Sequence, residues 1–279
     1  MYRLRRTSGE PLSLTKEHVA IAEPRRHVRW ELDVAEYQPD ALDRAGALWA
    51  DRARQELISL AHVTELAGKL QALGAPLDWS GALARVIADE VRHADLCLRL
   101  CDALGRPAEP EIDPRELRLV GGAGRSEVRN AIVAALCIGE TISGRALRRT
   151  SRAANVPLAR DVLAAILVDE VFHGELGWEL AALLMRRDGP AFDDEKAALV
   201  SDLPELFLHY AKVCGATREP AWARGEAEVE PGPNFGELTE AGYARAYFDA
   251  METDVVPGLV AIGLPEAELA YANVLASLG

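Results

Sequence analysis

A nine-residue segment occurs twice in this chain, and both copies contain the sequence Asp-Glu-x-x-His. Residues 88–96 and 168–176 are identical at five of nine positions, and a Pro-Leu pair begins 14 or 13 residues before the glutamate. This composition gives about 0.035 such tetrads by chance. Two copies in matching positions therefore indicate a repeated unit, in which a helix and a Pro-Leu turn precede a helix with the tetrad. The tetrad residues are Asp89, Glu90 and His93 in one copy, and Asp169, Glu170 and His173 in the other.

The repeat lies in a part of the chain with helical periodicity. Between residues 42 and 189 the sequence is rich in Ala, Leu, Arg and Glu, and apolar residues recur at steps of three and four. Proline and glycine divide this stretch, because proline cannot continue a helix and glycine permits the turn that ends one. The expected helices are 43–73, 80–104, 126–154 and 157–187, followed by 195–213, 239–256 and 265–278. Residues 1–41 have no clear period, so we expect an all-α fold with an N-terminal arm.

Each tetrad is suited to holding a metal ion. Residues i and i+3 share one face of an α-helix, so Glu90 can offer an oxygen and His93 a ring nitrogen to the same ion. The preceding helix of each unit carries a glutamate among apolar or small residues. Two antiparallel helices joined by a short turn would place this glutamate level with the tetrad. The candidate metal-binding and catalytic residues are therefore Glu56, Glu90, His93, Glu140, Glu170 and His173.

The alternative is that the tetrads lie on solvent-facing helix surfaces and share their spacing by coincidence. Apolar neighbours, Val86 and Val91 in the first copy and Ile166 and Val171 in the second, predict instead that both helices are largely buried. Buried carboxylates without a cation would each cost several kcal/mol. Carboxylate and imidazole ligands without cysteine favour iron or manganese over a structural zinc ion.

Other residues carry weaker signals. Asp89 and Asp169 precede the tetrad glutamates, so each is placed to accept the second ring N–H of a histidine on the partner helix, with a surface charge as the alternative. His209 is a candidate for an extra metal ligand or for a histidine of the core or rim. Gly139 and Gly144 lie near the third glutamate, where they leave room either for a substrate or oxygen cavity or for close helix packing.

These residues resemble the doubled motif of the ferritin-like di-iron carboxylate proteins, over about residues 42 to 187. The resemblance implies a ferritin-like four-helix bundle with a di-metal site. The spacing is similar to that of the oxygen-activating branches, such as arylamine N-oxygenases, ribonucleotide reductase small subunits and hydroxylases, and to that of rubrerythrin-like proteins. The motif is specific for the site and not for the reaction. The resemblance divides the chain into an arm (1–41), a bundle (42–189) and a C-terminal helical extension packed on the bundle (190–279).

The leading hypothesis for function is a non-haem di-iron oxidoreductase. Two iron ions, or a Mn/Fe or Mn/Mn pair, would activate dioxygen and oxidise a small organic substrate by hydroxylation, N-oxygenation or desaturation. The residues outside the bundle favour this hypothesis, because they exceed what iron oxidation requires. The alternatives are a ferroxidase or peroxidase of the rubrerythrin type and an interaction module in which metals are structural. The sequence contains no flavin or iron–sulfur motif, so we expect an external electron donor, and a homodimer is left open.

Charge and hydropathy argue against two classes of partner. A net charge of −13 argues against nucleic acid and against an anionic membrane surface. No apolar run approaches the roughly 18 to 20 residues of a membrane span, and no apolar segment follows the basic residues at the start. The four cysteines are too few for a disulfide scaffold. We therefore expect a cytoplasmic protein with reduced thiols.

Overall fold

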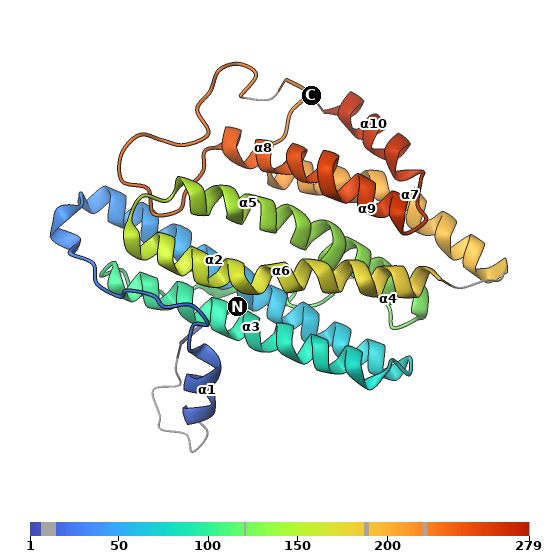
Figure 1. Cartoon of the computed structure of the whole chain (residues 1–279), viewed down its shortest axis with the longest axis horizontal. Helices are drawn as coiled ribbons and strands as arrows, with labels where there is room; N and C mark the ends of the chain where they lie inside the picture. The colour runs from blue at the N-terminus through green and yellow to red at the C-terminus, as the bar shows by residue number, and fades with distance from the viewer. Residues whose placement is uncertain (7–14, 120, 187–189, 220–221, 279) are drawn as a thin grey trace. The chain divides into compact units, whose positions relative to one another are not determined.

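The computed structural model describes residues 1–6, 15–119, 121–186, 190–219 and 222–278, and these residues are mostly helical (Figure 1). The all-α fold class is thereby confirmed. Within the described ranges the strands are limited to β1 (Tyr2–Arg3) and β2 (Glu111–Ile112), which pair antiparallel. The helices are α1 (Thr15–Ala22), α2 (Pro39–Ala72), α3 (Leu77–Ala103), α4 (Arg125–Ala131), α5 (Glu140–Ala153), α6 (Pro157–Met185), α7 (Pro190–Val213), α8 (Glu240–Ala250), α9 (Val256–Ala261) and α10 (Ala267–Ser277), with a 3₁₀ turn, η1 (Val34–Glu36).

The chain forms two compact units, and the boundary between them falls within α6, between Asp169 and Glu170. Unit 1 comprises residues 1–123, 154–169 and 233–237. Unit 2 comprises residues 124–153, 170–232 and 238–279. The expected division into arm, bundle and extension groups the helices in another way, and it stays a prediction.

Unit 1 is built on a hairpin of α2 and α3, which pack against each other along their length. The turn between them uses Gly74, whose φ of 77° lies in the left-handed region that glycine adopts without strain. Pro76 follows and occupies the position just before α3, where its missing N–H costs nothing. Trp49 of α2 is fully buried, and its indole N–H donates a 2.9 Å hydrogen bond to the carbonyl oxygen of Phe235. This hairpin positions the first group of candidate ligands.

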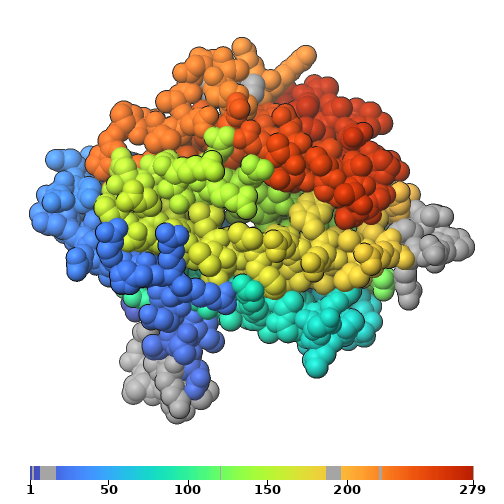
Figure 2. All heavy atoms as spheres, in the orientation of Figure 1, coloured from blue at the N-terminus to red at the C-terminus, as the bar shows by residue number. Residues whose placement is uncertain are grey.

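The N-terminal arm lies on the outside of unit 1. Helix α1 packs against α3, and Figure 2 shows the arm, in dark blue, at the surface beside the teal atoms of α3. Arg6 donates a 2.9 Å hydrogen bond from Nε to Oδ1 of the buried Asp95 on α3. The sequence of the arm has no clear period, so α1 is an addition to the sequence-based prediction.

Unit 2 contains two helices that are interrupted by π-helical turns. The π-helical segment η2 (Ile132–Gly139) joins α4 to α5, and a second one, η3 (Met251–Val255), joins α8 to α9. Helix α5 packs on α8, and α7 packs on α10. Arg145 on α5 donates a 2.6 Å hydrogen bond from Nε to Oδ2 of Asp254. Ion pairs as well as apolar contacts therefore hold α5 in this unit.

The helix expected at 126–154 is not one continuous α-helix. The structure replaces a continuous α-helix by α4, η2 and α5, because eight residues before Glu140 adopt the wider π-helical turn. The expected helix at 239–256 is likewise divided, into α8, η3 and α9, and it continues to Ala261. The other predicted helices agree with the structure to within five residues at their ends. Among the described residues, none of the helices has the length and apolar character needed to cross a membrane.

Candidate metal centre

Helix α3 presents Glu90 and His93 on one buried face. The two residues are three positions apart, so their side chains lie one above the other. Glu90 is 1% exposed and His93 is 0% exposed. Nδ1 of His93 lies 3.9 Å from Oε2 of Glu90. A carboxylate and an imidazole therefore meet inside the hairpin, out of contact with solvent.

Helix α2 brings Glu56 to the same place, as the hairpin geometry predicts. Oε2 of Glu56 lies 3.6 Å from Nδ1 of His93, so one ring nitrogen faces two carboxylates. Ser59, nearly one turn further along α2, donates a 2.9 Å hydrogen bond to Oε1 of Glu90. We call the group Glu56, Glu90 and His93 set A.

The other ring nitrogen of His93 faces Asp169. Nε2 of His93 lies 3.4 Å from Oδ2 of Asp169, and neither side chain is exposed. Burial would raise the pKa of Asp169, and so would the nearby Asp89, but the hydrogen bond with His93 and the charge of Arg25 outweigh both and lower that pKa. An ionised Asp169 favours the tautomer with the proton on Nε2, which leaves the lone pair of Nδ1 directed to set A.

Two arginines each contact both of the buried aspartates. Arg92 donates hydrogen bonds from Nη1 to Oδ1 of Asp89 at 2.7 Å and to Oδ2 of Asp169 at 3.0 Å. Arg25 of the arm contacts both carboxylates as well, with Nη2 2.7 Å from Oδ1 of Asp89 and Nη1 bonded to Oδ1 of Asp169. Sequence reasoning missed both arginines. Arg92 has a usable signal, its position three residues after Asp89, whereas Arg25 has none, because its partners are 64 and 144 residues away.

Unit 2 gathers a second group of the same composition, Glu140, Glu170 and His173, which we call set B. Each residue offers one ligand atom, and these atoms all lie within 4.8 Å of one another. Nδ1 of His173 lies 3.7 Å from Oε2 of Glu170. His173 is 1% exposed. Set B thus repeats in unit 2 the two carboxylates and one imidazole of set A.

Glu140 follows directly on the π-helical segment η2, and Tyr210 of α7 contacts that segment. The hydroxyl of Tyr210 donates a 3.0 Å hydrogen bond to the carbonyl oxygen of Ala134. A Cβ at Gly139 would lie 2.6 Å from the same hydroxyl oxygen, so only glycine leaves room for it. Burial, and then the charge of Glu140, raise the pKa of Tyr210 to about 12. Of the two explanations for Gly139, close packing therefore holds.

The structure also bears on three other sequence-based expectations, which concern the burial of α6, Gly144 and His209. Val171 is 48% exposed, so α6 does not bury both sides of its tetrad as the apolar pattern predicts; Val86 and Ile166 are buried as expected. A Cβ at Gly144 would meet no described atom within 4 Å, which leaves both explanations of this glycine open. His209 is exposed on α7, and its ring packs edge-on against Tyr210 with 5.2 Å between centroids. Neither set A nor set B includes His209.

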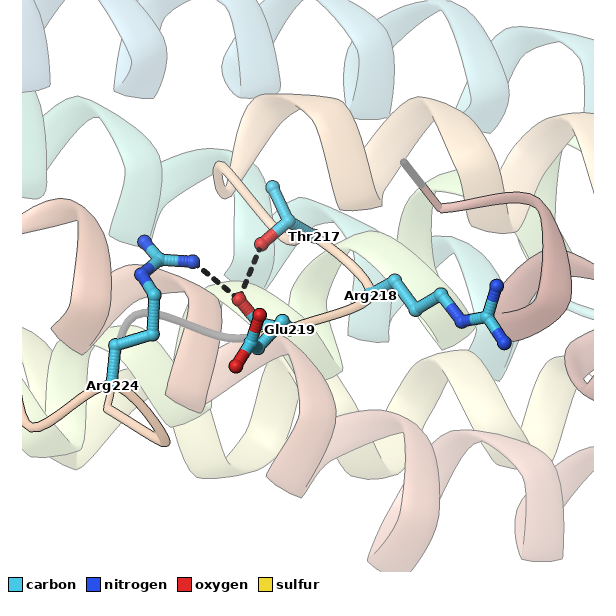
Figure 3. Close-up of a pocket in the computed structure, with 4 residues that line it drawn as sticks. All are labelled: Thr217, Arg218, Glu219 and Arg224. Atoms are coloured by element: carbon cyan, nitrogen blue, oxygen red, sulfur yellow. Dashed lines mark hydrogen bonds between the residues drawn. The ribbon is translucent and has the colours of Figure 1, made fainter.

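A pocket in unit 2 lies on the loop that follows α7 (Figure 3). Thr217, Arg218, Glu219 and Arg224 line it. The hydroxyl of Thr217 and Nη1 of Arg224 both donate to the carbonyl oxygen of Glu219, at 3.0 and 2.5 Å, while the side chain of Arg218 points away from this group (Figure 3). Nε of Arg224 also donates a 2.9 Å hydrogen bond to Oε1 of Glu226. None of the residues that line this pocket belongs to set A or set B.

Each set has the chemistry of a metal site, because two carboxylates close to one imidazole form a compact group of oxygen and nitrogen donors that a cation would neutralise. Family models, curated proteins and solved structures were compared with the chain, and none of them matches it. The function is therefore inferred from sets A and B themselves.

Proposed function

We propose that sets A and B together hold two iron ions and that the chain is a di-iron oxidase or oxygenase. The observation that carries this proposal is the matched composition of the two sets, each with two glutamates and one histidine from equivalent positions of the repeat. Asp169 and Glu170 are consecutive residues of α6, so the helix that supports His93 of set A also supplies a ligand of set B. A ferritin-like four-helix bundle of α2, α3, the α4–η2–α5 helix and α6 is part of the proposal.

The donor atoms suit iron. Four carboxylates balance the charge of two divalent ions, and the mixture of carboxylate and imidazole is typical of iron and manganese sites. Cys97 lies one turn after His93 on α3, where its thiol would be a competing ligand if it ionised. Burial, followed by the charge of Glu56, raises the pKa of the Cys97 thiol well above its ordinary value, so it stays neutral. A Mn/Fe or Mn/Mn pair would use the same donors.

Bound iron would supply the electrons that activate dioxygen for the oxidation of a substrate. The chain holds the ligands in place. Asp169 accepts the Nε2–H of His93 and so directs Nδ1 to the carboxylates of set A. Ser59 bonds Oε1 of Glu90, which leaves Oε2 on the side of His93. Apolar residues close in sequence to the ligands, such as Leu96 and Ile138, are fully buried, which limits the access of water to these parts of the helices.

A small organic substrate is the proposed target, oxidised by hydroxylation, N-oxygenation or desaturation. The support comes from a helix beyond the proposed bundle that reaches set B. Tyr210 of α7 contacts η2 next to Glu140. An external electron donor would supply the electrons for repeated turnover.

The test is the reaction of the reduced, iron-loaded protein with oxygen. Glu90→Ala and Glu170→Ala should each slow this reaction on the order of 100-fold, because each removes a ligand. Glu175→Ala is the matched control, since Glu175 is exposed on the same helix as Glu170, and it should react like the wild type. A wild-type protein that reacts no faster than Glu90→Ala contradicts the proposal. Rapid turnover of excess Fe(II) or hydrogen peroxide, without oxidation of any organic compound, contradicts the proposal of an oxygenase. That result would indicate a rubrerythrin-like or ferroxidase function instead.

A further inference from the structure

We propose that Arg25 of the N-terminal arm is a positioning residue for set A, which holds Asp89 and Asp169 in the orientation that fixes the ring of His93. This inference rests on the proposed function. It extends that function to a segment that the sequence places outside the bundle.

One guanidinium group joins two buried carboxylates from different helices. Arg25 lies with Nη2 2.7 Å from Oδ1 of Asp89 and donates from Nη1 to Oδ2 of the same residue at 3.2 Å. Nη1 also donates to Oδ1 of Asp169. Both aspartates are 0% exposed, and two such carboxylates repel each other unless cations lie between them. Arg92 supplies a cation to both aspartates from α3, and Arg25 supplies another to both from the arm, whereas Arg85 lies 3.6 Å from Asp89.

The contacts then lead from Arg25 to set A through a single residue. Asp169 bonds Arg25 through Oδ1 and faces Nε2 of His93 through Oδ2, at 3.4 Å. On the other side of the ring, Nδ1 of His93 faces Glu56 at 3.6 Å and Glu90 at 3.9 Å. Arg25 and Arg92 use both oxygens of Asp169, so the carboxylate cannot rotate without losing one of these bonds. Its orientation toward His93 therefore depends on Arg25.

The arm is held on both sides of Arg25, which keeps the guanidinium in place. The carbonyl oxygen of Glu23 accepts a 3.0 Å hydrogen bond from Nε of Arg92. Beyond Arg25, Val28 is 5% exposed, and Nε of Arg29 donates to Oδ2 of Asp161 at 2.9 Å. These contacts fix the arm at several points, and among the arm residues that the structure describes, Arg25 is the one that bonds both Asp89 and Asp169.

The burial of its partners distinguishes Arg25 from an ordinary surface ion pair. Arg29 and Asp161 form a pair with side chains 59% and 21% exposed, and such pairs contribute little to stability. Arg25 is 35% exposed, yet both of its partners are fully buried beside a proposed ligand. Loss of Arg25 should therefore change the orientation of Asp169 and His93 more than it changes the fold.

The first test measures the tautomer of His93 in metal-free protein by ¹⁵N nuclear magnetic resonance, with His93→Gln used to assign the signal. The wild type should hold the proton on Nε2, and Arg25→Ala should lose this preference. Arg25→Lys keeps the charge but cannot form the bidentate hydrogen bonds of a guanidinium group, so it should retain part of the preference for the Nε2–H tautomer. Arg26→Ala removes an equal charge from the neighbouring exposed position, and Arg29→Ala loosens the arm elsewhere; both should match the wild type. An unchanged tautomer in Arg25→Ala overturns the proposal.

The second test measures Co(II) affinity by titration of the full chain, with helix content followed by circular dichroism. Arg25→Ala should weaken the binding of one of two ions about 10-fold, the lower end of the range for residues that orient ligands, without loss of helix. In an Asp169→Asn background the same substitution should have little further effect, because it acts through Asp169. Equal affinity in Arg25→Ala and the wild type overturns the role of Arg25 and leaves the proposed function standing. A wild type that binds no metal overturns the proposed function. The role of Arg25 is then still tested by the tautomer of His93, which is measured in metal-free protein.

Discussion

Asp169 and His93, 76 residues apart in the chain, lie with a carboxylate oxygen 3.4 Å from the ring nitrogen Nε2, and both side chains are completely buried. The opposite nitrogen, Nδ1, faces Glu56 and Glu90. The two nitrogens of one imidazole thus have different partners, which is the arrangement that fixes a histidine as a metal ligand. The repeat in the sequence is the reason these groups meet, since each tetrad places an aspartate next to a glutamate.

Asp169→Asn should weaken metal binding at set A about 10- to 100-fold, because an amide in place of the carboxylate no longer favours the Nε2–H tautomer of His93. Isothermal titration with Co(II) measures the change. Asp161→Asn is the matched control, since Asp161 lies on the same helix, pairs with Arg29 and does not touch set A. If Asp169→Asn binds both ions as tightly as the control, Asp169 does not orient the ligand.

Gly139→Ala should destabilise the protein by about 1 to 3 kcal/mol, the usual cost of overpacking a filled site. The new Cβ would lie 2.6 Å from the hydroxyl oxygen of Tyr210, which is the end of a rigid side chain. Urea unfolding measures the change in free energy. The opposite result, a gain in stability from the better helix propensity of alanine, would show that Tyr210 moves aside at little cost.

Tyr210→Phe should cost about 0.5 to 1.5 kcal/mol, because it removes the hydrogen bond to the carbonyl oxygen of Ala134. It should also relieve most of the clash in Gly139→Ala. The double variant is therefore predicted to be more stable than the sum of the two single changes implies, and a double-mutant cycle measures this coupling. Strict additivity would mean that Gly139 and Tyr210 do not interact.

Stability should fall as the pH rises above about 10, the ordinary pKa of tyrosine. Burial raises the pKa of Tyr210 to about 12, so the folded protein retains a proton that the unfolded chain releases. The contribution is complete below pH 10 and is lost as the pH rises through about 12. Burial also raises the pKa values of Tyr247 and Tyr271, which strengthens the trend. Urea unfolding at several alkaline pH values measures the slope, which should be shallower in Tyr210→Phe and would be equal in both proteins if Tyr210 titrated normally.

Periodicity and helix-breaking residues predict the long helices well, because proline and glycine act locally. The hairpin of α2 and α3 and the composition of both ligand sets follow from the same signals. The π-helical segments η2 and η3 were missed, since nothing in Ile132–Gly139 or Met251–Val255 separates a π-helical from an α-helical turn. The exposure of Val171 depends on which neighbours cover α6, and the role of Arg25 depends on partners far away in the chain. Both are properties of tertiary packing that no local pattern encodes.

The central claim is that each chain holds two metal ions in two equivalent ligand sets. An anaerobic titration of the full chain with Fe(II), with bound iron counted after removal of the excess, tests it most directly. We predict saturation at two ions per chain in the wild type and weaker binding of one ion in His93→Ala and in His173→Ala. Saturation below two ions in the wild type, or two tightly bound ions in both histidine variants, would contradict the account.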